Sequence, residues 1–568
     1  MRRFLVGVLA AIGVVTLVIV GLVGALVWRF LPERHAFPAQ FVLTADWSQA
    51  LAETAGPPDL LDFRLTPAPT VSDIVLALDA ATRDPRVKGL VVRLAEARHG
   101  FAAAQELRDA VRRFRASGRF AIAHADSFGE LGPGNEAYYL ATAFDEIDLQ
   151  PVGLVGLTGL MAEVPLAREL LASLGVELEV VKREEYKTAL ESFTRSELSP
   201  ANREMLEGLL DGLQRQLVAG IAEGRKLDPV EVQRLIDHGP FTADEALANR
   251  LIDRIAHADE AMRAARERAG PGAGRVDLAD YAAQRPTVEA GAAKIALIRA
   301  AGLIRRGEDG VGFEIAAGDL AEALADAAGD DRIRAVILRI DSGGGSAVAS
   351  ETVARGVRRV REAGKPVIVS MGNTAASGGY WIAMDATRIV AQPGTITGSI
   401  GVIAGKPILS GVWDKIGVNW AEIARGAHAG MWSVNQPFSP EARARVEAVL
   451  DSIYGTFKAG VARGRSMTPE QVEAVAKGRV WIGVQAKDLG LVDELGGLDA
   501  ALAAARRELH LPDGAALDIE ILPRPRNPLL AALRWLRPQA GALAQAAALV
   551  RQLGAATGTA TLPPLGVH

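Results

Sequence analysis

The sequence predicts an α/β protein made of two tandem repeats that follow an N-terminal transmembrane helix. The segment from Asp84 to Leu94 returns from Asp330 to Ile340, an offset of 246 positions, and Ser199-Pro200 returns as Ser439-Pro440, an offset of 240. Such a nearly constant offset indicates one fold that occurs twice. Within each copy, short β-branched runs alternate with helical patterns, which is typical of a parallel sheet covered by helices.

The transmembrane helix is predicted from the first 30 residues. After Arg2 and Arg3, residues 4–28 carry no charge and are almost wholly Leu, Val, Ile, Ala and Gly, and a bilayer-spanning helix needs about 20 such residues. A cleaved signal peptide, the alternative, has a shorter apolar region and a small-residue cleavage site, whereas this run ends at Trp28. We therefore predict an uncleaved anchor with a cytoplasmic N-terminus. It crosses the inner (cytoplasmic) membrane once, and the rest of the chain faces the periplasm.

Composition and spacing divide the rest of the chain into three parts. The first repeat is predicted over residues 31–285 and the second over residues 286–520, with a linker rich in Gly, Pro and Ala around residues 271–286. The tail, residues 521–568, is rich in Ala and Leu with interspersed Arg. A helix in this tail would lie on a membrane surface, or dock on its own domain or a neighbouring subunit, and the sequence leaves both open.

The order of predicted elements is the same in both repeats. In the second repeat, a strand at 335–340 precedes a glycine run, a helix at 348–363, a strand at 367–371, a tight turn and a helix from about 379. Two amphipathic helices follow in each repeat, at 200–225 and 229–237 in the first and at 440–465 and 469–477 in the second.

Composition excludes several classes of function. The 568 residues carry 63 basic and 68 acidic side chains, a net charge of −5, without a long basic run, so nucleic acid is not an expected partner. The absence of cysteine excludes disulfides and thiolate chemistry, and it is compatible with an oxidising compartment. No cluster of His, Asp or Glu has metal-ligand spacing, so we expect neither a metal nor a cofactor.

Ser377 is the first candidate for chemistry. The segment from Met371 to Tyr380 joins a predicted strand to a predicted helix and consists almost wholly of small residues. Such a turn presents a hydroxyl beside backbone N–H groups at a helix N-terminus, where an alkoxide and an oxyanion are both stabilised. The N–H of Gly378 is a candidate oxyanion donor. The alternative is an ordinary turn or N-cap serine.

The glycine run in Asp341-Ser342-Gly343-Gly344-Gly345 is the second candidate. Its amides are suited to an anion, either a phosphate or a tetrahedral intermediate. It lacks the Lys-Ser/Thr pair of a P-loop, so an oxyanion hole is the better interpretation. The corresponding residues of the first repeat, Ala95 to His99, contain no glycine.

Lys187 is the third candidate, and the duplication singles it out. Aligning the repeats puts Asn135 opposite Ser377 and Lys187 opposite Ala427, with separations of 52 and 50 residues. An ancestral copy with both serine and lysine, followed by reciprocal loss, explains this pattern. To act as a base near pH 7, the amine needs a pKa about three units below its reference, which burial between the repeats would provide. His428, one residue beyond Ala427, is the alternative base.

Three segments together resemble a known family: Ala375 to Tyr380, Tyr186 to Ala189, and the glycine run after Ile340. They are similar to the long, duplicated form of bacterial signal peptide peptidase A, a family related to Clp-type proteases and the crotonase-like fold. The resemblance implies a Clp protease/crotonase-like fold for each repeat. One departure is the family's Asn-Ser-Pro-Gly-Gly turn, which is Asp-Ser-Gly-Gly-Gly here.

The resemblance also implies site roles. They are Ser377 as nucleophile, Lys187 as general base, Gly344 and Gly378 as oxyanion donors, and Ser399 as the hydrogen-bond partner of the lysine amine. Together with the predicted anchor, it implies a membrane-anchored serine endopeptidase that degrades apolar peptides such as cleaved signal peptides and forms a homotetramer. Two alternatives stay open: an acyl-CoA-type enzyme on a crotonase-like scaffold, and a non-catalytic membrane scaffold protein.

Overall fold

The computed structural model describes residue 21 and residues 36–54, 68–284, 291–308 and 314–523. Apart from Gly21, the predicted transmembrane helix lies outside these ranges, as does the tail beyond residue 523. Within them, no helix is both long and apolar enough to cross a membrane. By its internal contacts the chain divides into one compact unit up to Ile519 and a second unit from Glu520 onward. We call residues 36–284 the first half and residues 291–519 the second half.

The strands and helices of the first half alternate as expected for an α/β fold. In chain order they are β1 (Phe41–Asp46), α2 (Val71–Ala81), β2 (Val87–Leu94), α3 (Phe101–Ala116), β3 (Phe120–Ala125), α4 (Asn135–Ala141), β4 (Glu146–Leu149), β5 (Leu154–Val155), α5 (Arg168–Leu174), β6 (Glu177–Lys182), α6 (Glu191–Thr194), α7 (Pro200–Arg225), α8 (Pro229–Ile236), β7 (Phe241–Thr242), α9 (Ala243–Ala248), β8 (Arg254–Ile255), α10 (Ala258–Ala269), β9 (Gly274–Asp277) and α11 (Leu278–Ala283).

The second half continues the alternation, and a last strand runs beyond it. These elements are β10 (Ala293–Ala301), β11 (Leu303–Arg305), β12 (Glu314–Ala316), α12 (Ala317–Gly329), β13 (Ile333–Ser342), α13 (Ala347–Glu362), β14 (Val367–Ala376), α14 (Gly378–Ala383), β15 (Arg388–Ala391), β16 (Ile396–Gly398), β17 (Ile403–Ile408), α15 (Ser410–Ile416), α16 (Pro440–Arg465), α17 (Pro469–Val475), β18 (Val480–Ile482), α18 (Gly483–Asp488), β19 (Glu494–Leu495), α19 (Leu498–Glu508) and β20 (Leu517–Leu522).

Each half contains a parallel sheet with the same strand path. The first sheet has the order β8-β4-β3-β2-β1-β9, and β19-β15-β14-β13-β10 follow the corresponding path in the second. Even an irregularity of register is shared, because it falls between Phe41 and Val42 in one sheet and between Lys294 and Ile295 in the other. The predicted α/β class is confirmed, and the two halves are built alike.

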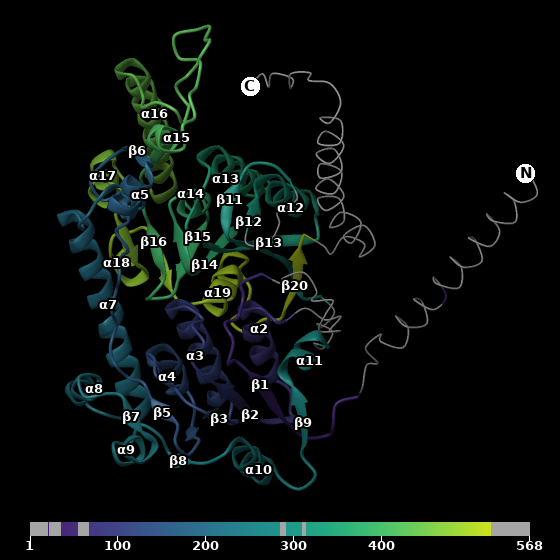
Figure 1. Ribbon diagram of the computed structural model, residues 1–568. Coiled ribbons are helices and arrows are strands. Elements are labelled where there is room, and N and C mark those ends of the chain that lie inside the picture. Colours follow the sequence, from purple (N-terminus) through teal and green to yellow (C-terminus); the bar gives the residue numbers. More distant parts are fainter. Residues whose placement is uncertain (1–20, 22–35, 55–67, 285–290, 309–313, 524–568) are drawn as a thin grey trace, which may run out of the picture. The chain divides into compact units, whose positions relative to one another are not determined.

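Helices cover both sheets in layers. In the first half, α10 packs against β1, β2 and β3, whereas α3 contacts β3 and also reaches β14 of the second half. Helix α19 packs on β13 and β14 and contacts α2, so α2, α3 and α19 lie between the two sheets (Figure 1). The pair α12 and α13 covers the other side of the second sheet.

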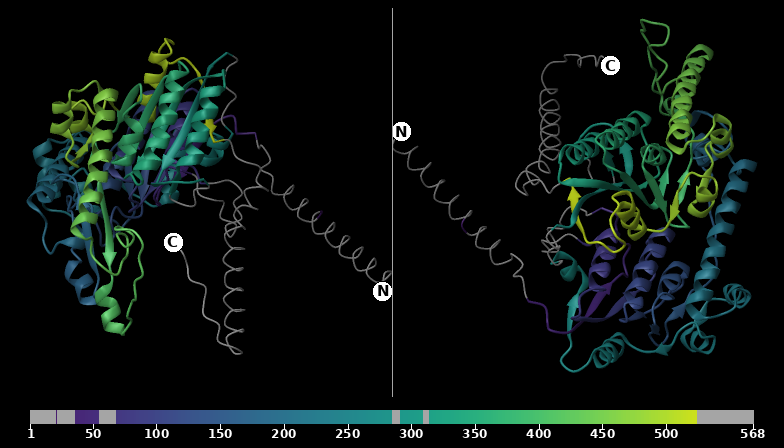
Figure 2. Two further views of the ribbon diagram at one scale, coloured as in Figure 1. Left: turned by 90° about the horizontal axis from the view of Figure 1, so that it is seen from above. Right: turned by 180° about the vertical axis from the view of Figure 1, so that it is seen from behind.

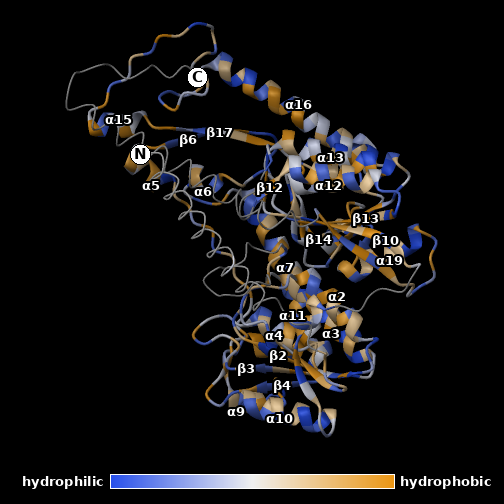
Figure 3. Ribbon diagram, turned by 90° about the vertical axis from the view of Figure 1, so that its right-hand side faces the viewer, coloured by the Kyte–Doolittle hydropathy of each residue, from blue (hydrophilic) through white to orange (hydrophobic). Residues whose placement is uncertain are grey.

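The central strands are apolar on both faces, as a sheet between two helical layers requires. Strand β13 is buried along almost its whole length, and β10 and β13 are mostly coloured as hydrophobic in Figure 3. The predicted strand 335–340 lies within β13, and the predicted helix 348–363 matches α13 within one residue.

Two long helices mark the duplication most clearly. Helices α7 and α16 each have 26 residues and begin at the predicted residues, Pro200 and Pro440. Ser199 and Ser439 cap them by accepting a backbone N–H, and a proline at the first helical position suits this cap. Figure 2 shows both helices, α7 in blue and α16 in green, from two further directions.

The predicted tight turn after Met371 is wrong, because β14 continues to Ala376. Two non-local contacts extend the strand. The carboxylate of Asp341 accepts the N–H of Thr374 at 2.8 Å, and residues 374–376 pair with β16. The sharp change of direction therefore falls on Ser377 itself.

Candidate active site

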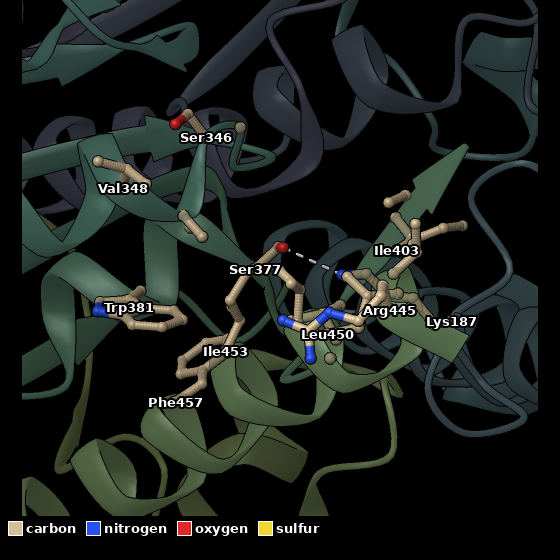
Figure 4. Close-up of a pocket in the computed structure, with 18 of the residues that line it drawn as sticks. Lys187, Ser346, Val348, Ser377, Trp381, Ile403, Arg445, Leu450, Ile453 and Phe457 are labelled. Atoms are coloured by element: carbon tan, nitrogen blue, oxygen red, sulfur yellow. Dashed lines mark hydrogen bonds between the residues drawn. The ribbon is translucent and has the colours of Figure 1, made fainter. Parts of the chain in front are cut away.

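Ser377 occupies a strained corner between β14 and α14. Its backbone has φ +54° and ψ −117°, a conformation that costs a non-glycine residue free energy and is typical of functional sites. Its N–H donates to Gly398 O at 2.9 Å, which fixes the corner. A side chain at the next residue, Gly378, would meet Ser350 Oγ at 2.5 Å, so the corner needs a glycine there. The hydroxyl points toward Lys187 (Figure 4).

Lys187 reaches this corner because a strand of the first half pairs with a strand of the second. Strands β6 and β17 run antiparallel, with Lys182 opposite Ile403. Beyond β6, the N–H of Arg183 donates to Val402 O at 3.1 Å and that of Tyr186 to Lys477 O at 3.2 Å. The loop that carries Lys187 is thus held by the backbone of the other half.

The amine of Lys187 makes three hydrogen bonds. Nζ lies 3.0 Å from Ser377 Oγ, 2.9 Å from Ser399 Oγ and 3.1 Å from Ser399 O. A neutral amine has two hydrogens and one lone pair. If the two oxygens of Ser399 take the hydrogens, the lone pair is left for the hydroxyl proton of Ser377. The predicted lysine, nucleophile and orienting serine therefore meet in one cluster.

Burial controls the charge of this amine. Lys187 is only 5% exposed, and desolvation lowers its pKa from 10.5 to about 8. A protonated lysine cannot accept a proton from serine, whereas an amine with this pKa is partly neutral at physiological pH.

We expect kcat/KM for a peptide ester to rise with pH and to reach half its maximum near pH 8. The amine is the active form, so activity falls about tenfold per unit below the pKa of Lys187 and is level above it. Initial rates from pH 6 to pH 10 measure this profile. A profile without an inflection near pH 8 would contradict Lys187 as the base.

The glycine run lies against the serine corner. Gly344 has φ +106°, and a Cβ on it would lie 2.7 Å from Gly378 N. Strand β11 braces the run, because Ile304 N donates to Gly344 O at 3.0 Å and Ser346 N donates to Ile304 O at 2.9 Å. This bracing holds the turn without the family's proline. The N–H of Gly344 donates to Ser342 Oγ at 3.1 Å, whereas Gly345 and Gly378 line the cavity beside Ser377.

An apolar cavity of about 580 Å³ opens in front of the serine. Trp381 and Phe457 stack with ring centroids 4.5 Å apart and form part of its lining. Val348, Ile403 and Leu450 line it further (Figure 4). Such a lining suits an extended apolar peptide.

His428, the alternative base, lies in an exposed loop at this cavity. Among the described residues, the hydroxyl of Ser377 is hydrogen-bonded to Lys187 and not to His428. The geometry therefore favours the lysine.

The corresponding position in the first half has no nucleophile. Asn135 lies where Ser377 lies in the second half, and its Oδ1 accepts the N–H groups of Thr158 and Gly159 at 2.9 and 3.0 Å. Glu136 replaces the glycine after the serine, and backbone N–H groups of the loop that begins at His99 bind its carboxylate. Burial raises the pKa of Glu136 to about 7. The first half therefore has neither the serine nor the glycine of the catalytic corner.

Sequence reasoning missed a buried ion cluster beneath the site. Arg339 on β13 is 1% exposed and binds Glu53 at 2.6 Å and Glu106 at 2.7 Å, both from the first half. A second link is Asn373, which donates to His99 O at 2.8 Å. The sequence does contain a signal for this cluster: an arginine stands inside an otherwise apolar strand, and such a charge is buried only with a partner.

A serine on a strained corner, an amine of lowered pKa beside it and a peptide-sized apolar cavity together define a serine peptidase. Residues 133–271 and 359–511 match the model of Peptidase family S49. The chain belongs to this family, and the predicted resemblance is confirmed. The prediction of a serine peptidase is confirmed over its two alternatives, the acyl-CoA-type enzyme and the non-catalytic scaffold.

Several relatives support this assignment. The chain is 32% identical to "Serine protease SPPA, chloroplastic" of Arabidopsis thaliana, over 79% of this chain and 67% of that protein. It is 34% identical to "Protease 4" of Salmonella typhi, over 76% of this chain and 71% of that protein. It is also 34% identical to "Putative signal peptide peptidase SppA" of Enterococcus faecium, over 33% of this chain and 55% of that protein.

Proposed function

We propose that this peptidase is a membrane-anchored endopeptidase in which Ser377 is the nucleophile and Lys187 the general base. The observation that carries the proposal is the 3.0 Å contact between the buried amine and the serine hydroxyl. Neutral Lys187 takes the hydroxyl proton while Oγ bonds to the carbonyl carbon, and the carbonyl electron pair moves onto its oxygen. Collapse breaks the C–N bond, and the lysine ammonium protonates the leaving amine. Lys187 then deprotonates a water that hydrolyses the acyl ester.

The oxyanion is stabilised by two backbone N–H groups, of which Gly378 supplies one. Gly344 was predicted to supply the other. We propose Gly345 instead, because the N–H of Gly344 is bonded to Ser342 Oγ and Gly345 lines the cavity. Ser399 keeps the role predicted for it, that of orienting the amine of Lys187.

Each repeat has a Clp protease/crotonase-like fold, and the proposed repeats comprise residues 31–285 and 286–520. The common strand path and the shared irregularity of register support a duplication. The anchor is residues 1–30, which places the catalytic portion in the periplasm and the chain in the inner membrane.

The substrates are apolar peptides such as cleaved signal peptides. The apolar lining of the cavity supports this class, as does the name of the Enterococcus faecium relative. The active form is a homotetramer. Exposed apolar side chains on α5, α15 and the loop after α15 support self-association, among them Leu170, Leu174, Ile416, Trp420 and Ile423.

The nucleophile is tested by trapping. We expect an apolar peptidyl fluorophosphonate to lose fluoride and to form one covalent adduct, located at Ser377 by mass spectrometry of the digested protein. His428→Ala is the control and should be labelled as fast as the native chain. Undiminished labelling of Ser377→Ala, or an adduct on another residue, would overturn the assignment.

A further inference from the structure

The ionisable side chains that line the catalytic cavity are all of the basic type. They are Lys187, His428 and Arg445, and none of the described lining residues is a carboxylate. Lys187 belongs to the catalytic cluster. The remaining charge in this otherwise apolar space comes from the permanently protonated guanidinium of Arg445. An apolar substrate alone does not account for an arginine in this place.

Arg445 lies on the face of helix α16 that is turned toward the cavity. Its neighbours Val446, Val449 and Leu450 line the same space. Figure 4 shows the side chain of Arg445 turned into the cavity, with α16 behind it. The residue is exposed, so a ligand has access to its guanidinium.

The acidic groups next to Arg445 on α16 have other partners. Glu447 pairs with Arg443 at 3.3 Å, and Arg443 also reaches Glu179 at 3.2 Å. The carboxylate of Glu441 is bonded to Ser439 and to backbone at the start of the helix. Among the described residues, Arg445 itself forms no ion pair with a carboxylate.

We propose that Arg445 determines specificity by binding a carboxylate of the peptide substrate. The proposal rests on the proposed function of the same site. A planar guanidinium binds a carboxylate through two parallel hydrogen bonds, and this geometry selects a carboxylate over a neutral amide. The enzyme then prefers apolar peptides that carry an acidic group close to the scissile bond. That group is an Asp or Glu side chain or the free C-terminus of the peptide, since both present the same chemistry.

This role is separate from catalysis. The lowered pKa of Lys187 is caused by burial, without a contribution from Arg445. Substitution of Arg445 should therefore raise KM for acidic substrates while kcat and the pH profile stay as in the native chain.

The test uses three apolar peptides of one sequence and the full chain in detergent. The reference peptide has Asn beside the scissile bond and an amidated C-terminus. The second replaces Asn with Asp, and the third has a free C-terminus. We expect the native enzyme to cleave at least one of the two acidic peptides with a kcat/KM roughly tenfold above the reference, as a charged hydrogen-bond pair would give. The preference should shrink as salt is raised.

Arg445→Gln should abolish this preference, so that the variant cleaves all three peptides with about the same kcat/KM. Arg203→Gln is the matched control, because Arg203 is an exposed arginine at the start of the corresponding helix α7, outside the residues that line the cavity. Arg445→Glu should invert the preference toward a peptide with Lys in place of Asn. If Arg445→Gln loses only the preference for the Asp peptide, Arg445 binds a side-chain carboxylate. If it loses only the preference for the peptide with a free C-terminus, Arg445 binds the terminal carboxylate.

Equal cleavage of all three peptides by the native enzyme would overturn the proposal, as would a preference that survives Arg445→Gln. Neither result would contradict the proposed peptidase function, because that function is measured by cleavage of the reference peptide. The peptide preference of the native enzyme and its decrease with salt are measured without any variant. The proposal can therefore be tested even if an Arg445 variant folds poorly.

Discussion

Replacing Lys187 with methionine is expected to abolish peptide hydrolysis and, at neutral pH, to make the fold more stable. Without the amine, the Ser377 hydroxyl has no base at 3.0 Å, and loss of such a base costs on the order of a thousandfold or more in kcat. Ser377→Ala should be equally inactive. His428→Ala should keep its activity.

The stability effect follows from the pKa of the lysine. Burial lowers this pKa from 10.5 to about 8. Below pH 8 the folded and unfolded states are both protonated, and the folded state carries the full cost of a buried ammonium, about 3 kcal/mol. Between pH 8 and pH 10.5 only the unfolded state holds the proton, so native stability rises with pH. Above pH 10.5 the cost is gone.

Methionine has a similar shape and no charge, so Lys187→Met removes this cost. Chemical unfolding at pH 7 and pH 10.5 measures the change: we expect a gain approaching 3 kcal/mol at pH 7, reduced by the lost hydrogen bonds, and a much smaller gain at pH 10.5. Ser377→Ala is the control and should keep the native pH dependence. Retained activity, or a gain that is independent of pH, would contradict the assignment of Lys187 as a buried base.

Replacing Arg339 with methionine is expected to destabilise the chain by about 3–5 kcal/mol, because two buried carboxylates then lose their counter-charge. Glu53 is 6% exposed and Glu106 is 1% exposed. Burial already raises the pKa of Glu106, and Arg339 opposes this rise. Without the arginine this pKa rises further. The destabilisation should therefore be smaller at pH 5 than at pH 8, where an unpaired carboxylate must stay ionised or take up a proton.

Urea unfolding at these two pH values tests the prediction. Arg388→Met is the matched control, because Arg388 pairs with Glu508 while 48% exposed, and such a surface pair contributes about 0–1 kcal/mol. Adding Glu106→Gln to Arg339→Met should recover part of the loss. If Arg339→Met and Arg388→Met lower the free energy of unfolding by the same amount, the Arg339 cluster does not hold the halves together.

The sequence predicted well where the signal is local or where the duplication supplies a comparison. Helices α7 and α16 begin at the predicted residues because a Ser-Pro cap acts within a single turn. Lys187 was identified because its separation from Asn135, 52 residues, nearly equals that of Ala427 from Ser377, 50 residues. The resulting expectation, an amine close to the serine, agrees with their 3.0 Å contact.

Non-local contacts explain what the sequence did not predict. Strand β14 extends beyond its predicted end because the carboxylate of Asp341, 33 residues earlier in the chain, accepts the N–H of Thr374. Arg339 and its partner Glu53 are 286 residues apart, so no window of sequence contains both. The pairing of β6 with β17 is also non-local, and the sequence pattern of neither strand predicts which strand it pairs with.

That pairing also determines when the enzyme can act. Lys187 and Ser377 are 190 residues apart in the chain, and they meet only after β6 has found β17. During synthesis, the proposed base, Lys187, is therefore made long before the proposed nucleophile, Ser377. The site is incomplete until both halves have been synthesised and β6 has paired with β17.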